Sequence, residues 1–211
     1  MNEILTVAEL AAASKSTLSH YEQHAVAFWD GTRTHDVSQN VQALLAALGD
    51  QPGQRILDFG CGPGRDLIDF LRRGHAAVGL DGCEAFVHMA RELSGATVLH
   101  QDFLALDLPT EGFDGVFANA SLFHVPTQEL PRVLEQLWRC LRPAGVLFCS
   151  NPRGDNHEGY KGARYGAYHD EHRWREHVVN AGFDELARYY RPEGLPREQQ
   201  PWLATLWRKP T

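Results

Sequence analysis

Between residues 54 and 151, short runs of apolar residues alternate with stretches in which apolar residues recur at helical spacing. The short runs predict β-strands, and the helically spaced stretches predict amphipathic helices. The predicted strands span residues 55–59, 76–80, 97–100, 113–118 and 145–150, and the predicted helices span 65–73, 84–93 and 128–141. Continuous apolar strands that alternate with helices are typical of a parallel sheet with helices on both of its faces.

The first fifty residues carry a helical pattern only. They predict a short lead-in helix near 8–12, a helix through 21–29, and a third helix that runs from Asp36 or Ser38 to Gly49. Asp and Ser are favoured N-caps because their side chains accept from free backbone N–H groups, and glycine is favoured just after the last helical residue. These helices form an N-terminal cap on the alternating segment.

At the other end, residues 172–181 predict a helix, and residues 184–191 and 202–209 predict two strands joined by a proline-rich loop. These two strands are interpreted as an antiparallel hairpin that closes one side of the sheet. The chain therefore predicts one doubly wound, mostly parallel, three-layer α/β domain over residues 1–211. Its parts are a helical cap (1–50), a core (54–151), a connecting segment (152–170), and a final helix with the closing hairpin (171–211).

The composition narrows the range of partners. Lys and Arg number 20 against 27 Asp and Glu, whereas proteins that bind a phosphate backbone usually carry a basic excess, so nucleic acid is not expected as a partner. No apolar stretch approaches the roughly 18 residues of a membrane span, and Met1–Ser16 lacks the basic start of a signal peptide. We therefore expect a cytoplasmic monomer or homodimer. The four cysteines form no CxxC pair, which predicts reduced thiols and no metal site.

A glycine-rich loop, Asp58-Phe-Gly-Cys-Gly-Pro-Gly64, joins the first predicted strand to the helix that begins near Arg65. Glycines in this position let the backbone turn sharply and approach a ligand, and the start of the helix offers free N–H groups to a carboxylate or phosphate. The spacing is GxGxG preceded by an acid. It matches neither the GxGxxG of dinucleotide-binding proteins nor a phosphate-binding loop that ends in GKS or GKT.

This loop and four later motifs resemble the core of the class I S-adenosylmethionine-dependent methyltransferases, over residues 54–151. The first motif of that family has the form (E/D)xGxGxG, and an acid, here Asp81, follows its second strand. Gln101-Asp-Phe103 is similar to the segment after the third strand, and residues 113–119 resemble the FDxVxxx motif. Leu141-Arg-Pro-Ala-Gly145 resembles the LKPGG turn, with alanine replacing the first glycine.

The resemblance implies a Rossmann-like fold with S-adenosyl-L-methionine as its cofactor. In the family, the acid after the second strand binds the ribose hydroxyls, and an acid after the third strand lies near the adenine; Asp102 is equally a residue that opens a turn. The expected cofactor-binding residues are Tyr21, Trp29, Asp58, Gly60, Cys61, Gly62, Gly64, Arg65, Asp66, Asp81, Gly82, Gln101, Asp102, Phe103, Asn119, Ala120 and His124. Asp114, at the start of the fourth strand, is expected to be structural.

The acceptor is expected beyond the carboxyl ends of the fourth and fifth strands, where open α/β sheets bind their ligands. His124 follows the fourth strand; it contacts the cofactor, acts as a general base, or pairs with the backbone. Tyr21 resembles the tyrosine that many small-molecule members of the family place before the core. His124 and Tyr21 are the candidate catalytic residues.

Residues 152–170 combine glycines with tyrosines, which predicts either a mobile lid over the acceptor or a surface loop ordered by its own aromatic side chains. Arginines near the expected mouth of the site favour an acceptor with an anionic group such as a carboxylate. The candidate substrate-binding residues are Arg33, Asp36, Asn151, Arg153, Arg164, Tyr165 and Tyr168.

These features predict in-line methyl transfer from S-adenosylmethionine to a nitrogen, sulfur or oxygen atom of a polar small molecule. The GxGxG spacing disfavours a nicotinamide dehydrogenase. A methyltransferase acting on protein or RNA needs a recognition domain or a basic surface, for which 211 residues and a net charge of -7 leave little room. A protein that binds the cofactor without turnover would carry the same motifs and stays an alternative.

Overall fold

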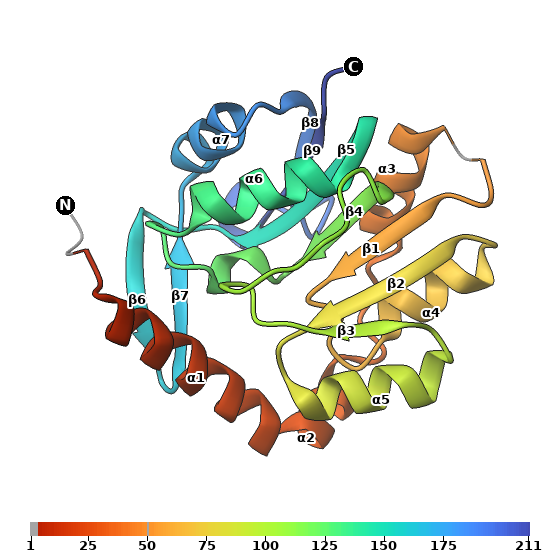
Figure 1. The fold of residues 1–211 in the computed structure, drawn as a ribbon. Coiled ribbons are helices and arrows are strands. Elements are labelled where there is room, and N and C mark those ends of the chain that lie inside the picture. The colour runs from red at the N-terminus through yellow and green to blue at the C-terminus, as the bar shows by residue number, and fades with distance from the viewer. Residues whose placement is uncertain (1–3, 50) are drawn as a thin grey trace.

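A seven-stranded sheet runs through the centre of the molecule, with helices on both of its faces (Figure 1). The computed structural model describes residues 4–49 and 51–211, so Met1–Glu3 and Asp50 of the predicted cap lie outside the described residues. The strand order is β3-β2-β1-β4-β5-β9-β8, in which the first five strands are parallel and the last two are antiparallel to their neighbours. The predicted Rossmann-like, doubly wound fold with a closing hairpin is confirmed.

The elements of the core follow the predicted boundaries to within a few residues. The strands of the main sheet are β1 Arg55–Phe59, β2 Ala76–Asp81, β3 Val98–His100, β4 Phe113–Asn119, β5 Leu141–Pro152, β8 Asp184–Arg191 and β9 Trp202–Arg208. The helices are α1 Val7–Gln23, α2 Ala25–Thr32, α3 Ser38–Leu48, α4 Arg65–Arg72, α5 Glu84–Ser94, α6 Leu130–Cys140 and α7 Glu171–Asn180, with short 3-10 turns η1 Leu122–His124 and η2 Arg197–Gln199.

The N-terminal helices differ from the prediction. The lead-in near residues 8–12 is the start of a 17-residue helix, α1, that includes Tyr21. The helix predicted through 21–29 is divided at His24 between α1 and α2, and α2 continues to Thr32. A capping box explains the early start: Glu9 N–H donates to Thr6 Oγ1, and the Glu9 carboxylate accepts from Thr6 N–H. The third helix, α3, ends at Gly49 as expected, since Gly49 adopts a left-handed conformation (φ 97°).

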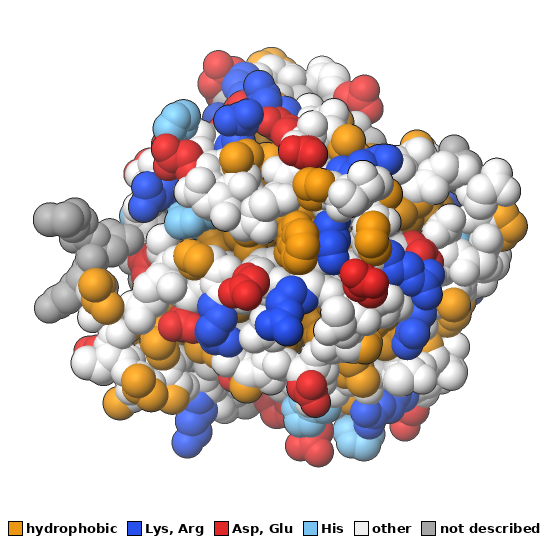
Figure 2. Space-filling view, turned by 45° about the horizontal axis from the view of Figure 1, so that its top comes forward, with side chains coloured by type: hydrophobic (Ala, Val, Ile, Leu, Met, Phe, Trp, Pro, Cys, Tyr) orange, Lys and Arg blue, Asp and Glu red, His pale blue; other side chains and the backbone are white. Residues whose placement is uncertain are grey.

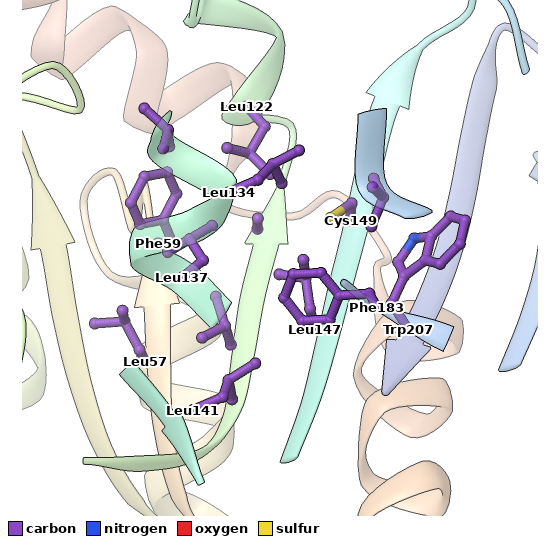
Figure 3. Packing of buried hydrophobic residues seen from close by; sticks show 14 of the residues in the cluster. Leu57, Phe59, Leu122, Leu134, Leu137, Leu141, Leu147, Cys149, Phe183 and Trp207 are labelled. Atoms are coloured by element: carbon purple, nitrogen blue, oxygen red, sulfur yellow. The ribbon is translucent and has the colours of Figure 1, made fainter. Parts of the chain in front are cut away.

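Two hydrophobic layers hold the sheet, because successive residues of a strand point to opposite faces. Leu57 and Phe59 of β1 face α6 and α7, whereas Ile56, which precedes them, faces α3 and α4. Figure 3 shows Leu134 and Leu137 of α6 beside Phe59 on the first of these faces. Burial of each such Leu or Phe side chain contributes about 1.5–3 kcal/mol relative to exposure in water.

The connecting segment 152–170 is a hairpin and not a loop, which corrects the prediction. Strands β6 (His157–Lys161) and β7 (Arg164–Tyr168) pair with each other in antiparallel fashion and form a separate two-stranded sheet beside α1 (Figure 1). Tyr160 and Tyr165 face each other across the pair, with ring centroids 5.2 Å apart. Such cross-strand aromatic pairs stabilise hairpins, so Tyr160 and Tyr165 contribute to strand pairing. That this segment closes over the acceptor stays a prediction.

The carboxyl ends of the parallel strands β1, β2, β3 and β4 lie at one edge of the sheet, which α1, α2 and the β6–β7 hairpin border (Figure 1). The opposite edge carries the turns that lead into the strands. Among residues 4–49 and 51–211, no helix combines the length and the apolar character that crossing a bilayer requires.

Candidate active site

A cavity with about 700 Å³ of open space lies at the carboxyl ends of β1, β2 and β4, beneath α1 and α2. It brings together nine of the predicted site residues: Tyr21, Gly60, Gly62, Asp81, Gly82, Asp102, Phe103, Ala120 and His124. These residues come from five separate parts of the chain, so the fold itself assembles the site. Their expected roles in binding and catalysis stay predictions.

Other cavity residues were missed from the sequence. They are Ser14, Thr17, Leu18, Phe28, Phe86, Leu104, Ser121 and Pro126. Ser14, Thr17 and Leu18 share one face of α1 with Tyr21, because residues three and four apart are neighbours on a helix. Interpreting residues 7–23 as one helix would have found them. The Phe28 ring also borders the cavity, and its centroid lies 5.6 Å from the centroid of the Tyr21 ring.

The glycine loop approaches the cavity with its bare backbone. Gly60 has φ 76°, and a Cβ built on it would lie 2.4 Å from Cβ of Ser121, which no side chain tolerates without displacement. The loop is fastened to the end of β2, because Gly60 N–H and Cys61 N–H both donate to the Leu80 carbonyl, at 2.8 and 3.0 Å. The glycines therefore keep this wall of the cavity open.

Asp81 lies at the end of β2 and is 8% exposed. Its Oδ2 accepts from Gly62 N–H and its Oδ1 from Cys83 N–H, both at 2.9 Å. Burial raises the pKa of Asp81 to about 6, although the backbone N–H groups of Cys83, Gly62 and Gly82 act in the opposite direction. Each carboxylate oxygen accepts up to two hydrogen bonds, so Asp81 has capacity left for donors of a ligand.

A buried polar network lies behind the glycine loop, outside the cavity lining. Arg65 Nε donates to Asp66 Oδ1 at 2.6 Å, and Asn119 Nδ2 donates to Asp66 Oδ2 at 3.2 Å. Asn119 Oδ1 accepts from Asn40 Nδ2 of α3, and Asn40 Oδ1 accepts from the Tyr189 hydroxyl of β8. Arg65, Asp66 and Asn119 were predicted to bind the cofactor. The structure places them as supports of the loop and of the end of β4.

Asp58 and Cys61 belong to the same supporting layer. Asp58 is 2% exposed, and its Oδ2 has no hydrogen-bond partner within the described residues. Burial, together with the nearby Asp66 carboxylate, raises the pKa of Asp58 well above its ordinary value. The Cys61 thiol packs on β2, since a Cβ on Gly79 would lie 2.9 Å from its sulfur. Gly64 packs on α5, where its missing side chain lets Ala90 approach.

At the other end of the cavity, Asp102 and Phe103 follow β3. Asp102 Oδ1 accepts from Leu104 N–H at 2.8 Å, which is the turn geometry of an aspartate, and its Oδ2 accepts from the Ser14 hydroxyl of α1. Phe103 stacks on Phe59 with ring centroids 4.3 Å apart. Gln101 points away, because its amide pairs with the backbone of Asp107.

Tyr21 and His124 form a hydrogen-bonded pair at the cavity wall. The Tyr21 hydroxyl lies 2.9 Å from His124 Nε2, and His124 Nδ1 lies 2.8 Å from the Tyr165 carbonyl oxygen. A carbonyl only accepts, so Nδ1 carries the proton, and Nε2 accepts from the Tyr21 hydroxyl. Burial lowers the pKa of His124 to about 4, so its ring is neutral near pH 7. Two of the three roles considered for His124, backbone pairing and proton acceptance, are compatible in this geometry.

None of the seven predicted substrate-binding residues belongs to the cavity lining. Arg33 is exposed and lies 3.9 Å from Asp30, and Asp36 accepts from Ser38 N–H at the start of α3. Arg153 donates to the carbonyls of Arg197 and Gln200 and stacks on Tyr190, so the β8–β9 connection holds it.

The remaining candidates divide in the same way. Asn151 and Tyr168 do not line the cavity, and Trp29 lies half-buried on α2, also outside the cavity. Tyr165 is 5% exposed, and its hydroxyl donates to Glu158. Arg164 lies outside the lining as well but contacts a lining residue: its guanidinium lies 5.8 Å from the Tyr21 ring centroid and 3.4 Å from the Tyr21 hydroxyl.

Protonation of buried histidines is expected to destabilise the protein below neutral pH. Burial lowers the pKa of His124 and His169 to about 4, whereas an unfolded chain protonates them near pH 6.5. Their contribution to the free energy of unfolding is therefore complete above pH 6.5 and lost as the pH falls toward 4. Asp81 and Asp58, whose pKa values burial raises, oppose this loss, but burial also lowers the pKa values of His75 and His177, which add to it.

We expect the urea midpoint to be lower at about pH 5 than at about pH 7.5. His169→Gln should reduce the difference, because His169 Nε2 is buried beside His177 without a partner in the described part of the chain. An equal midpoint at the two pH values would show that these rings protonate in the folded state.

A family model for a methyltransferase domain matches residues 56–145. Among curated proteins, the sterol 24-C-methyltransferase of Yarrowia lipolytica is 32% identical over 131 residues, which are 57% of this chain and 32% of that protein. The trans-aconitate 2-methyltransferase of Variovorax paradoxus is 33% identical over 156 residues, 72% of this chain and 58% of that protein. The chain thus spans between a third and three fifths of the length of these two relatives.

A solved structure agrees with the family model. The 1,6-didemethyltoxoflavin-N1-methyltransferase of Burkholderia thailandensis, which holds 1,6-didemethyltoxoflavin and S-adenosylhomocysteine, superimposes with a TM-score of 0.78 at 22% identity, over 100% of this chain and 94% of that one. Residues 56–145 therefore form a methyltransferase domain, and the whole chain has the fold of that S-adenosylhomocysteine-bound methyltransferase. The sequence resemblance is confirmed, and S-adenosylmethionine is the cofactor of this methyltransferase.

The cavity of this methyltransferase fits that cofactor. Asp81 is a buried acceptor with unused capacity, which suits a pair of hydroxyl donors. Gly60 and Gly62 leave bare backbone where a side chain would fill the space, and Phe86 and Phe103 supply apolar walls for a flat ring. When bound, the cofactor supplies a methyl group on a sulfonium, which is reactive without help from the protein.

Proposed function

We propose that this methyltransferase acts on a polar small molecule that carries a negative charge, and that it methylates a nitrogen, sulfur or oxygen atom of that molecule. The observation that carries the proposal is the Tyr21–His124 pair at the cavity wall with Arg164 beside it. The pair provides a proton acceptor and the arginine provides a charge, both next to the cavity that fits the cofactor.

The Tyr21–His124 pair supports proton removal from the acceptor. A proton passed to the Tyr21 oxygen is balanced by transfer of the tyrosine's own proton to His124 Nε2. The Arg164 guanidinium, 3.4 Å from that oxygen, stabilises the negative charge that develops on it. Burial raises the pKa of Tyr21, and Arg164 acts against this increase. A relay of this kind suits a weakly acidic N–H, S–H or O–H group.

Arg164 also supports the negative charge on the acceptor. None of the ion pairs among residues 4–49 and 51–211 involves Arg164, so its guanidinium is available for a carboxylate or phosphate. The name of one relative gives an anion, trans-aconitate, as its acceptor. The name of one solved structure gives a nitrogen atom, N1, as the site of methylation. The sequence also offered Arg33 and Arg153 for this role, but Arg153 is held by the β8–β9 connection and Arg33 lies exposed beside Asp30, outside the cavity lining.

The surface supports a small acceptor over nucleic acid. In the view of Figure 2, Lys and Arg side chains are interspersed with Asp and Glu on this face, without a continuous basic stripe. A phosphate backbone is bound by clustered cations along its path. The alternative of a protein that binds the cofactor without turnover is disfavoured by the Tyr21–His124 pair, since cofactor binding alone does not require a proton acceptor there.

A screen of metabolite extracts with isotope-labelled S-adenosylmethionine tests the proposal. The expected result is one labelled product of low mass and negative charge, identified by mass spectrometry. Cofactor binding in calorimetry without any labelled product would favour a binding protein. Label on protein or RNA would favour a macromolecular acceptor.

Arg164→Ala is expected to raise the KM for the anionic acceptor by about tenfold or more, the loss of one charge-assisted hydrogen bond. Lys161→Ala is the matched control, because Lys161 is an exposed cation that faces Arg164 across the same hairpin. Steady-state kinetics of both variants should show a change for Arg164→Ala alone. An equal change in both would mean that the general charge of the hairpin, and not a contact of Arg164, attracts the acceptor.

A further inference from the structure

The β6–β7 hairpin pairs with no strand of the main sheet, so side-chain contacts fix its position. An isolated two-stranded hairpin is marginally stable in water and needs other parts of the protein to hold it. On the α1 side, Tyr165 N–H donates to Thr17 Oγ1 at 2.9 Å, and the Ser16 hydroxyl donates to the Ala163 carbonyl at 2.7 Å. On the other side, the hairpin contacts the η1 turn and the residues that follow it.

Glu158 of β6 makes the second set of contacts. Its Oε1 accepts from the Tyr165 hydroxyl at 2.7 Å, and its Oε2 accepts from Thr127 N–H at 3.0 Å and from the Thr127 hydroxyl. One carboxylate therefore joins the ring of Tyr165 to the segment that carries His124, three residues before Thr127. Three donors on one ionised acceptor form a strong and directional junction.

The same tyrosine holds His124 through its backbone. The Tyr165 carbonyl accepts from His124 Nδ1–H, so the contacts form a closed ring: His124 to Tyr165, Tyr165 to Glu158, Glu158 to Thr127, and Thr127 back to His124 along the chain. A neutral imidazole adopts either tautomer unless a neighbour selects one. In this ring the Tyr165 carbonyl selects the tautomer of His124, and the contacts of Tyr165 with Glu158 and Thr17 fix the position of that carbonyl.

We propose that Glu158 is a positioning residue for the reaction: by holding Tyr165, it keeps the Tyr165 carbonyl on His124 Nδ1 and thereby keeps His124 Nε2 unprotonated toward Tyr21. This inference rests on the proposed function, because the tautomer that Glu158 maintains is the one in which the proton passes from Tyr21 to His124. Without the junction, His124 also samples the tautomer with the proton on Nε2. In that tautomer Nε2 is a donor and accepts no proton from Tyr21.

The test compares Glu158→Gln and Tyr165→Phe, singly and together, with Glu135→Gln as the matched control. Glutamine keeps the size of the side chain but presents an NH₂ group to one of the three donors, and phenylalanine removes only the hydroxyl. Glu135 lies exposed on α6, away from the hairpin. Nitrogen-15 NMR of the histidine rings reports which nitrogen of His124 carries the proton, with no acceptor needed. Calorimetry gives the cofactor affinity, and kinetics with the acceptor from the screen give kcat and KM.

In the unmodified protein and in Glu135→Gln, His124 is expected as the Nδ1–H tautomer alone. In Glu158→Gln and in Tyr165→Phe, the signals should shift toward a mixture of tautomers, kcat should fall by about tenfold, and the cofactor Kd should stay within about twofold. Because both substitutions break one junction, the double variant should be little worse than the more affected single variant.

An unchanged His124 tautomer in Glu158→Gln overturns the proposal, as does a double variant whose loss in kcat is the product of the two single losses. A failure of the proposed function has a different signature. In that case no labelled product appears with any variant, while the NMR spectra still show whether Glu158 sets the tautomer.

Discussion

Asp81→Asn is expected to lower the affinity for S-adenosylmethionine by about 100-fold, which corresponds to about 2.7 kcal/mol. The carboxylate accepts from Gly62 N–H through one oxygen and from Cys83 N–H through the other. Asparagine has nearly the same shape but only one oxygen, so its NH₂ group faces one of these N–H donors. The substitution therefore removes a buried acceptor that the glycine loop and the ligand hydroxyls share. Isothermal calorimetry with S-adenosylmethionine measures the loss directly.

The pH dependence of binding provides a check on the same residue. Because burial raises the pKa of Asp81 to about 6, the affinity should fall as the pH decreases through this value, and Asp81→Asn should lack this titration. A variant that binds within threefold of the unmodified protein would show that Asp81 only fastens the loop. Glu135→Gln, a similar change at an exposed site on α6, controls for the substitution.

Tyr21→Phe is expected to lower kcat by about 100-fold, within the range that a positioned proton acceptor contributes. The substitution removes the hydroxyl that connects the cavity to His124 Nε2 and leaves the ring, which packs on Phe28 and Phe86, in place. The cofactor Kd should therefore stay within about threefold, since the packing is retained. Single-turnover kinetics with saturating cofactor separate this effect from product release.

A comparison with His124→Gln tests whether the two residues act together. If the proton passes from Tyr21 to His124, the two substitutions should give similar losses, and the double variant should add little. An unchanged kcat in Tyr21→Phe would mean that the acceptor attacks without losing a proton, as a carboxylate does. Arg164 would then act on the acceptor alone.

The sheet could be predicted from the sequence because it depends on local patterns. Each strand of the core is a short apolar run, and the glycines of the loop and the acid at the end of β2 stand at fixed offsets from those runs. The parallel arrangement then brings Gly60 and Asp81 to one edge without further information. For the same reason, nine of the residues predicted to bind the cofactor line the cavity, whereas none of those predicted to bind the acceptor does.

The β6–β7 hairpin could not be predicted in this way. Residues 157–168 contain three glycines and three tyrosines, a composition that also suits a loop, and their alternation becomes visible only when Tyr160 is set opposite Tyr165. Which of the predicted substrate-binding arginines lies beside the cavity also depends on tertiary contacts. Arg153 and Arg164 carry equal charges, but the β8–β9 connection holds the first and Tyr21 lies beside the second.

The place of β9 in the sheet bears on how the protein folds during synthesis. Residues 202–208 form the strand between β5 and β8, so β8 has no neighbour in the sheet until β9 has left the ribosome. Until then β5 also presents an open edge, and such edges pair with other chains. The hydrogen bond from Tyr189 of β8 to Asn40 reaches the network behind the glycine loop. The hydrogen bonds behind the glycine loop are therefore complete only after β9 has joined the sheet, and a nascent chain that stalls before residue 202 exposes the edge of β5.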